Sequence, residues 1–271
     1  MTSRITHRLR RVSTLLIAAI FAAGAPVVAQ APPVQTSQAV QATPTVNPTP
    51  KAARFVVVLD AAHGGDDGGA HLNSAVAEKT VTLALSVRLR SLLTARGFQV
   101  VTTREGNINL DGDARAQIAN RAASGAGLSA CVSLHATESG SGVHLFISPI
   151  AATAPTRFLP WKTAQSAYVN RSLKLAGALD AAFQHSGDGG SSAVGAIDAT
   201  VARASVAGLD SMACPAVAVE IAPIRGSDRG IVTDVTDPQY QSQIVEALAA
   251  ALLEWKTELE PGSVSAGGRQ P

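Results

Sequence analysis

Apolar residues along the chain form two patterns, and each predicts a type of secondary structure. Consecutive apolar residues between Arg54 and Asp60 end in a polar, glycine-rich turn, which is typical of a buried strand covered on both faces. Between Glu78 and Arg96, apolar residues recur at positions 81, 85, 89, 92 and 93, the spacing of an amphipathic helix, and Gly97 follows as a C-terminal cap. The same patterns predict strands at 98–103, 129–135, 142–147 and 215–221, and helices at 111–126, 168–183 and 235–255.

Strands and helices alternate in this prediction, which favours an α/β domain with a mainly parallel sheet and helices on both faces. Ligand sites in such sheets lie beyond the carboxyl ends of the strands. His63 follows the first strand by three residues, His135 ends a middle strand, and Glu220 lies near the end of a late strand. Glu78 opens the first helix, so we expect it at the same edge of the sheet.

These four side chains are candidates for a catalytic zinc site. Two imidazoles and one carboxylate are a common ligand set for zinc, and a second carboxylate can accept a proton from water. The spacing alone is a weak signal, because there is no H-E-x-x-H motif and 15, 57 and 85 residues separate His63, Glu78, His135 and Glu220. A histidine that ends a strand is more often a hydrogen-bonded core residue, and Glu220 could instead be a buried carboxylate in a salt bridge.

Residues near the candidates have roles that the sequence leaves open. Asp60 and Asp67 could accept hydrogen bonds that orient His63, or could simply shape the loop. Arg104 and Arg115 are expected to form structural ion pairs.

Composition supports a packed domain and excludes several functional classes. The 271-residue chain is 46% hydrophobic and 15% charged, too apolar for a wholly disordered protein. A formal charge of +2 lacks the basic excess of a nucleic-acid binder. Two cysteines without a C-x-x-C pair exclude a zinc ribbon and an iron–sulfur scaffold. Cys131 and Cys214 could form a disulfide or remain two buried thiols, and the sequence favours neither.

The first 29 residues have the chemistry of a signal peptide: a basic head with four arginines, an apolar run from Leu15 to Ala23, and small residues up to Ala29. A retained membrane anchor is the alternative, but it needs about 20 apolar residues, and Gly24 and Pro26 interrupt this stretch. Cleavage would change the formal charge from +2 to −2, because the segment carries four arginines and no acidic residue. The mature protein is then expected in the periplasm or outside the cell, without a membrane span.

Four segments are therefore expected along the chain. A signal peptide at 1–29 precedes a linker at 30–53 that is rich in proline, threonine and glutamine. A single α/β domain covers 54–257, and a flexible polar tail covers 258–271.

Six segments of the domain resemble, in the same order, the motifs of the type 3 family of N-acetylmuramoyl-L-alanine amidases, which are zinc-dependent. The segment from Val57 to Ala70 resembles the family's V-I-D-P-G-H-G-G-x-D-P-G-A loop. The other five are Glu78-Lys79 with Leu83 (E-K-x-x-N-L), Gly97 to Arg104 (G-x-x-V-x-L-T-R), Arg115 with Ala119 to Arg121 (R-x-x-x-A-N), Cys131 to Ala136 (F-I-S-I-H-A) and Pro215 to Glu220 (P-A-V-L-V-E). Their joint occurrence across 54–255 is a strong signal.

The resemblance implies a fold, a site and a reaction. It makes His63, Glu78 and His135 zinc ligands and Glu220 the catalytic glutamate, in an αβα sandwich around a six-stranded sheet. The implied reaction is hydrolysis of the amide bond between N-acetylmuramic acid and L-alanine in peptidoglycan, during cell-wall remodelling or daughter-cell separation. Expected partners are peptidoglycan and an activator protein, with the chain itself a monomer.

Departures from the family motifs keep two other functions open. Thr82 stands where an asparagine is usual, and Ile221 to Gly226 replaces the family's x-G-F-x-S-N segment. A related zinc peptidase that cuts within wall peptides would use the same four site residues. The altered segment after Glu220 also motivates a degenerate, non-catalytic peptidoglycan-binding domain.

Overall fold

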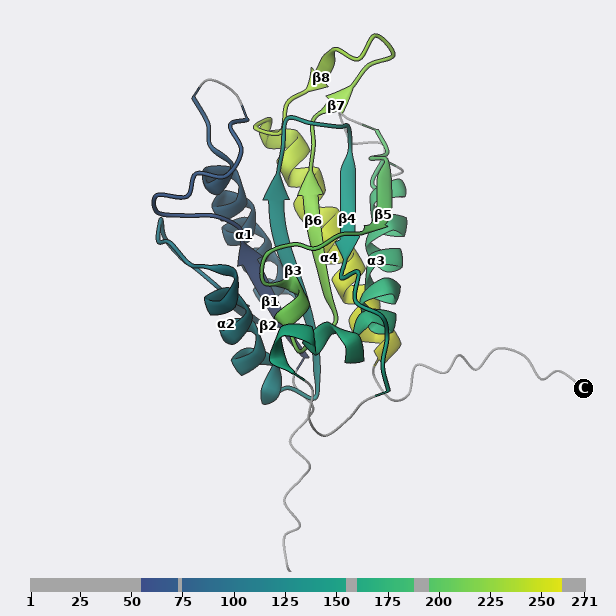
Figure 1. Ribbon diagram of the computed structural model, residues 1–271. Coiled ribbons are helices and arrows are strands. Elements are labelled where there is room, and N and C mark those ends of the chain that lie inside the picture. Colours follow the sequence, from purple (N-terminus) through teal and green to yellow (C-terminus); the bar gives the residue numbers. More distant parts are fainter. Residues whose placement is uncertain (1–54, 73–74, 155–159, 188–194, 260–271) are drawn as a thin grey trace, which may run out of the picture. The chain divides into compact units, whose positions relative to one another are not determined.

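The predicted buried strand is β1 (Phe55–Ala61), in which all seven residues are buried. In the computed structural model, which describes residues 55–72, 75–154, 160–187 and 195–259, β1 belongs to a six-stranded sheet with the order β2-β1-β3-β6-β4-β5 (Figure 1). The neighbours pair in parallel, except that β4 is antiparallel to β6. The other strands are β2 (Gln99–Thr102), β3 (Leu128–Ala136), β4 (Val143–Ile147), β5 (Ala199–Arg203) and β6 (Ala216–Ile221). The predicted α/β class and the mainly parallel sheet are confirmed.

Helices cover both faces of this sheet, so the sheet is the middle layer of three (Figure 1). One core lies between the sheet and α1, α3 and α4, and a smaller core lies between the opposite face and α2 with η2. Successive residues of β1 supply both cores, since Val57 packs in the first and Val58 in the second. The helices are α1 (Glu78–Ala95), α2 (Gly112–Ser124), α3 (Val169–Gln184) and α4 (Pro238–Leu259), with short 3-10 helices η1 (Trp161–Ala167) and η2 (Leu209–Ser211).

Local chemistry sets the helix ends that the sequence predicted. Gly97 follows α1 with φ +82°, a conformation that favours glycine and ends the helix. Asp111 begins α2, where its side chain accepts a hydrogen bond from the Ala114 N–H at 2.7 Å. Both caps confirm the predicted boundaries to within two residues.

The described residues belong to one compact unit, Pro50–Pro271. The predicted signal peptide at 1–29 and linker at 30–53 lie outside the described residues, as does most of the predicted tail. Helix α4 continues to Leu259, so the first two residues of the predicted tail are in its last turn. Among the helices that the structure describes, none combines the length and hydropathy needed to cross a bilayer.

A hairpin that the apolar pattern did not predict follows β6. It consists of β7 (Ile224–Arg225) and β8 (Ile231–Thr233), and β7 lies in the segment that departs from the family motif. Arg225 connects it to the loop after β3, because its guanidinium donates to the Gly140 and Glu138 carbonyl oxygens at 2.8 and 2.6 Å. The hairpin extends beyond the carboxyl ends of β3 and β6 (Figure 1).

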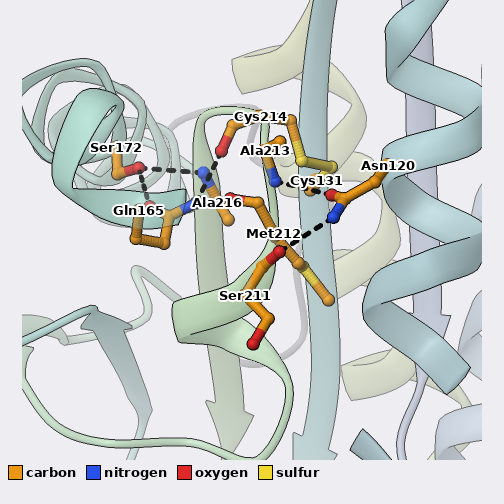
Figure 2. The surroundings of a disulfide bond; sticks show 9 residues. All are labelled: Asn120, Cys131, Gln165, Ser172, Ser211, Met212, Ala213, Cys214 and Ala216. Carbon is orange, nitrogen blue, oxygen red and sulfur yellow. Dashed lines mark hydrogen bonds between the residues drawn. A yellow bond between two sulfur atoms is a disulfide. The ribbon is translucent and has the colours of Figure 1, made fainter. Parts of the chain in front are cut away.

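A disulfide joins Cys131 and Cys214, which resolves the alternative that the sequence left open (Figure 2). It connects β3 to the segment just before β6, across 83 residues of sequence. Closing a loop of that length stabilises the folded state by about 4.5 kcal/mol on the chain-entropy estimate. Gln165 supports the same segment, because its amide donates to the Met212 and Cys214 carbonyl oxygens at 2.6 and 2.7 Å. These contacts align the two strands that carry His135 and Glu220.

Candidate metal centre

His63 lies in the loop after β1, where the backbone adopts an uncommon conformation. Its φ is +60°, and Gly64 and Gly65 follow with φ +135° and +62°. A left-handed conformation costs a residue other than glycine on the order of 1–3 kcal/mol, and it persists only where surrounding contacts hold it. The loop must therefore be fixed by its neighbours.

Two buried arginines supply these contacts. Arg115 donates to the carbonyl oxygens of Ala61 and His63 at 2.7 and 2.8 Å. Arg104 donates to the carbonyl oxygens of Ala61 and Ala62 at 2.8 and 3.0 Å. Three consecutive carbonyl groups are satisfied in this way, which fixes the backbone that presents the His63 ring.

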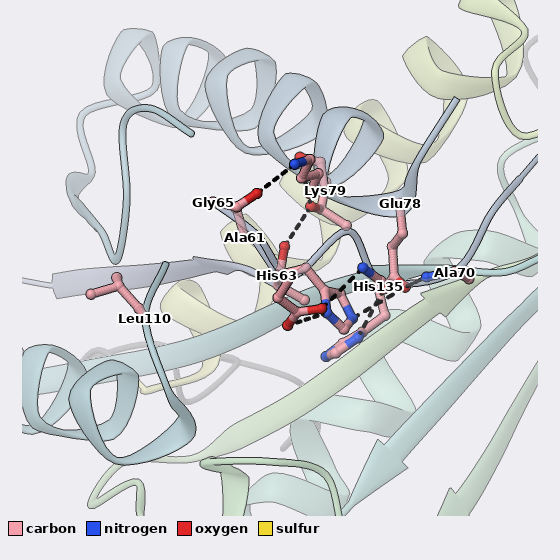
Figure 3. A network of polar contacts seen from close by, with 12 residues as sticks. Ala61, His63, Gly65, Ala70, Glu78, Lys79, Leu110 and His135 are labelled. Atoms are coloured by element: carbon pink, nitrogen blue, oxygen red, sulfur yellow. Dashed lines mark hydrogen bonds and ion pairs between the residues drawn. The ribbon is translucent and has the colours of Figure 1, made fainter. Parts of the chain in front are cut away.

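His63, Glu78 and His135 converge at the carboxyl edge of the sheet (Figure 3). The Nε2 atom of His63 lies 3.1 Å from Glu78 Oε2, and the Nδ1 atom of His135 lies 3.1 Å from Glu78 Oε1. One ligand atom from each residue can be chosen so that all three lie within 4.8 Å of one another. Gly69 permits this approach, because a Cβ there would lie 2.5 Å from Glu78 Oε2. His63, Glu78 and His135 thus form one cluster, although 15 and 57 positions separate them in the sequence.

Glu78 is buried and held as a carboxylate. Its oxygens accept hydrogen bonds from the backbone N–H groups of Ala70 and Ala136 at 2.9 and 3.1 Å. Burial by itself would raise the pKa of Glu78, but the hydrogen bonds from His135, His63 and Ala70 outweigh it and hold the pKa well below its ordinary value. The group is therefore charged across the physiological range, as a metal ligand must be.

Asp67 orients the His63 ring, as the sequence suggested. Its Oδ2 atom lies 2.8 Å from His63 Nδ1, which leaves Nε2 directed at Glu78. The hydrogen bond with Glu78 raises the pKa of His63; burial opposes the rise, and the contact with Asp67 adds to it. His63 is thus more readily protonated than an ordinary histidine while no metal competes.

We expect metal-free protein to lose stability as the pH rises through neutrality. The folded pKa of His63 lies above the ordinary 6.5. Protonated His63 therefore stabilises the fold fully below about pH 6.5, and this contribution is lost as the pH rises through the folded pKa. The thermal midpoint of EDTA-treated protein should fall between about pH 6 and about pH 8. In the His63→Gln variant the fall should be smaller, and an equal fall would contradict this origin.

The donor set fits zinc. Two imidazole nitrogens and one carboxylate oxygen are typical zinc ligands, whereas magnesium and calcium prefer oxygen donors alone. His63 Nε2 and His135 Nδ1 both face the Glu78 carboxylate. The centroids of the two imidazole rings are 5.7 Å apart, and the ring planes are at 89° to each other. The three ligand atoms therefore lie close enough together to bind a single ion.

Glu220 lies beside this cluster on the neighbouring strand. In the parallel pairing of β3 with β6 it is opposite His135, and on its other side it is opposite His144 of β4. Its neighbours Val219 and Ile221 point into the larger core, so Glu220 points to the other face, which His135 shares with Cys131. Adjacent strands are about 4.8 Å apart, which places Glu220 next to the ligand cluster.

The salt-bridge alternative for Glu220 is not seen among the described residues. Arg203 donates to the Ser148 carbonyl oxygen at 3.2 Å, and the Arg225 guanidinium donates to three carbonyl oxygens. The part of the chain that the structure describes contains no ion pair of either arginine with Glu220. Glu220 is half-buried.

The structure confirms the predicted ion pair for Arg115 but not for Arg104. Arg115 pairs with Asp60 at 2.8 Å. Arg104 instead bonds to carbonyl oxygens and to Thr82 Oγ1 at 3.1 Å, and no salt bridge to it occurs in the described ranges. Thr82, which stands in place of the family's asparagine, also donates to the Ala62 carbonyl oxygen at 2.9 Å.

Asp60 does not form a hydrogen bond or ion pair with His63 among the described residues. It bonds to Thr103, Arg115 and Ser133, and Ser133 in turn lies against His135. Sequence analysis did not single out Ser133. Its position two residues before His135, on the same face of a strand, was the only signal that could have identified it.

Comparisons with known proteins identify the family and the fold. The family described as N-acetylmuramoyl-L-alanine amidase matches residues 57–254. A Buchnera aphidicola protein assigned the same activity is 33% identical over 99 residues, which cover 35% of this chain and 44% of that relative, so the match spans less than half of its length. The apo form of the amidase Ami1 from Mycobacterium abscessus superposes with a TM-score of 0.56 at 20% identity, covering 75% of this chain and 99% of that one.

A third similar structure contains a second protein. It is the CwlD amidase from Clostridioides difficile in complex with the GerS lipoprotein, with a TM-score of 0.50 at 18% identity, covering 75% of this chain and 98% of that one. At these identities the two structures establish the shared fold, while the family match over most of the domain establishes the relationship in sequence.

Proposed function

The chain belongs to the N-acetylmuramoyl-L-alanine amidase family, and from this membership we propose that it hydrolyses the amide bond between N-acetylmuramic acid and L-alanine in peptidoglycan, using zinc. The observation that carries the proposal is the convergence of His63, Glu78 and His135 at one edge of the sheet, with Glu220 on the adjacent strand. A family motif without this convergence would support only the fold.

The proposed ligands of zinc are His63 through Nε2, His135 through Nδ1, and the Glu78 carboxylate. Zinc with three protein ligands keeps a position open for water, and when bound it lowers the pKa of that water and polarises the substrate carbonyl group. The protein contributes a charged, buried Glu78 between two imidazoles whose rings are oriented in advance. Little reorganisation is then needed on binding.

Glu220 is proposed as the general base and then the general acid. Its carboxylate accepts a proton from the attacking water as the new carbon–oxygen bond forms. The same proton is then donated to the departing amide nitrogen, so that the carbon–nitrogen bond breaks and L-alanine leaves with a free amino group. Proton transfer of this kind typically contributes about 100- to 10,000-fold to the rate.

Mass spectrometry of digested sacculi tests the reaction. The expected products are free stem peptides that begin with L-alanine, and glycan strands that lack peptides. Stem peptides that are cut internally and remain attached to glycan would show a wall peptidase instead. Binding to sacculi without released fragments would show a non-catalytic binding domain. A sample incubated with a chelator serves as the control, because release that persists there would contradict a zinc reaction.

The proposed setting is outside the cytoplasm, where peptidoglycan lies. Residues 1–29 would direct export as a cleaved signal peptide, leaving a soluble monomer without nucleic-acid partners. An activator protein is proposed by analogy, since the similar CwlD amidase forms a complex with a lipoprotein. Wall remodelling and daughter-cell separation are the processes that such an activity would serve.

A further inference from the structure

A buried polar chain connects Asp60 to the second histidine of the site. Asp60 is only 2% exposed, and its carboxylate accepts three hydrogen bonds. Oδ1 accepts from Thr103 Oγ1 at 2.7 Å and from Arg115 Nη1 at 2.8 Å, and Oδ2 accepts from Ser133 Oγ at 2.7 Å. These contacts join residues 43, 55 and 73 positions apart in the sequence.

Ser133 carries the chain onward to His135. Its hydroxyl oxygen lies 3.3 Å from His135 Nε2, while the opposite ring nitrogen, Nδ1, lies 3.1 Å from Glu78 Oε1. Ser133 is itself 2% exposed, so water does not offer an alternative partner for its hydroxyl group. Each ring nitrogen of His135 therefore faces a different polar group.

The direction of each hydrogen bond follows from the chemistry of the groups. A carboxylate has no hydrogen to donate, so the Ser133 hydroxyl must donate to Asp60. Its remaining lone pairs can only accept, and His135 must then donate from Nε2. In the metal-free protein Nδ1 donates to the Glu78 carboxylate, and a zinc ion at Nδ1 would replace that hydrogen. The ring would then keep its one hydrogen on Nε2, where Ser133 accepts it. The reverse arrangement would leave the buried Asp60 oxygen without its donor.

We propose that Asp60 and Ser133 are positioning residues that act in series, fixing the His135 tautomer so that Nδ1 is available to the metal. The inference rests on the proposed zinc site. The two histidines are then oriented differently: Asp67 contacts His63 directly at Nδ1, so that Nε2 faces Glu78, whereas Asp60 acts on His135 through a serine, so that Nδ1 faces Glu78.

The Asp60→Asn substitution tests the series because it reverses the direction of donation. The asparagine oxygen would accept from Thr103 and Arg115, and its NH₂ group would donate to Ser133. The serine hydroxyl would then donate to His135 Nε2, so the ring would keep its one hydrogen on Nδ1, the nitrogen that has to bind the metal. Loss of such outer contacts typically weakens metal binding about 10- to 100-fold. We expect the zinc dissociation constant of Asp60→Asn to rise toward the upper end of that range.

The Ser133→Ala variant shows whether Asp60 affects zinc affinity through Ser133 or only by disrupting the fold. It leaves His135 Nε2 without a partner, and we expect about a tenfold weaker zinc affinity. In the variant that combines Asp60→Asn with Ser133→Ala, the asparagine has no serine through which to act. The zinc affinity of this double variant should therefore equal that of Ser133→Ala alone. Additive losses, or an affinity of Ser133→Ala within about twofold of wild type, would overturn the proposal.

Competition with a chromophoric chelator measures the zinc affinity, and long-range ¹H–¹⁵N correlation of histidine-labelled, metal-free protein reads the tautomer directly. Wild type should show a hydrogen on His135 Nε2, and Asp60→Asn should show none there, because that nitrogen would accept from Ser133. Thr103→Val is the matched control, because it removes another buried hydrogen bond to the same carboxylate and should leave tautomer and affinity unchanged. An unchanged tautomer in Asp60→Asn would overturn the relay. Failure of wild type to bind zinc would instead overturn the metal site, and the tautomer measurement would still decide the relay.

Discussion

Glu220→Gln is expected to lower kcat about 100- to 10,000-fold while zinc content stays at the wild-type level. Glutamine has nearly the same shape as glutamate but cannot accept the water proton, so it removes the proposed proton transfer. Glu220 is beside His135 in the strand pairing but outside the three-residue ligand cluster, which is why the metal should remain. Stem-peptide release from purified muropeptides measures kcat, and elemental mass spectrometry measures zinc.

Glu138→Gln is the matched control for this variant. Glu138 lies on the loop that follows β3, at the same edge of the sheet, and its side chain is exposed. The same loss of charge there should leave turnover unchanged, since only its backbone carbonyl oxygen takes part in the Arg225 contact. Turnover by Glu220→Gln that matches the Glu138→Gln control would remove Glu220 from the reaction.

His63→Ala and His135→Ala are each expected to abolish stoichiometric zinc binding and, with it, activity. Only Glu78 and the other histidine then remain of the three ligands. Metal catalysis contributes several kcal/mol to the lowering of a barrier, so turnover should fall by at least about a thousandfold. Zinc content after dialysis and stem-peptide release are the two measurements.

His71→Ala provides the comparison for zinc content. His71 follows the same loop but is exposed and is not one of the three clustered residues. It should retain zinc at the wild-type level, whereas the two ligand variants should not. Full zinc occupancy in either ligand variant would contradict the assignment of that histidine, even if activity were lost.

Much of the fold could be predicted because buried strands and amphipathic helices leave a strong pattern. Strand β1 reads as consecutive apolar residues because both of its faces are covered. Helix α1 buries Val81, Leu85, Leu89 and Leu93, which recur at the helical spacing. Strand β5 was missed for the converse reason: it is an edge strand with four of its five residues exposed. The hairpin of β7 and β8 likewise lacks a buried face and an apolar period.

The candidate site was predictable to a different extent. His63, Glu78, His135 and Glu220 could be named because each lies in a recognisable motif at an end of a strand or helix. Their convergence needed the strand order β1-β3-β6, which places distant segments side by side. Thr82 illustrates what motif comparison cannot evaluate, since a departure from the family turned out to keep hydrogen bonds to the same loop.

The sequence by itself determined the α/β class, the family resemblance and the identity of the four candidate residues, because periodicity and motifs are local properties of the chain. Only the tertiary structure decided which ring nitrogen of each histidine faces Glu78, which carbonyl groups the two buried arginines satisfy, and that Ser133 links Asp60 to His135. Those contacts join residues many tens of positions apart, and their direction depends on side-chain orientation. No local pattern in the chain encodes that orientation, because it arises only when the strands pack beside one another.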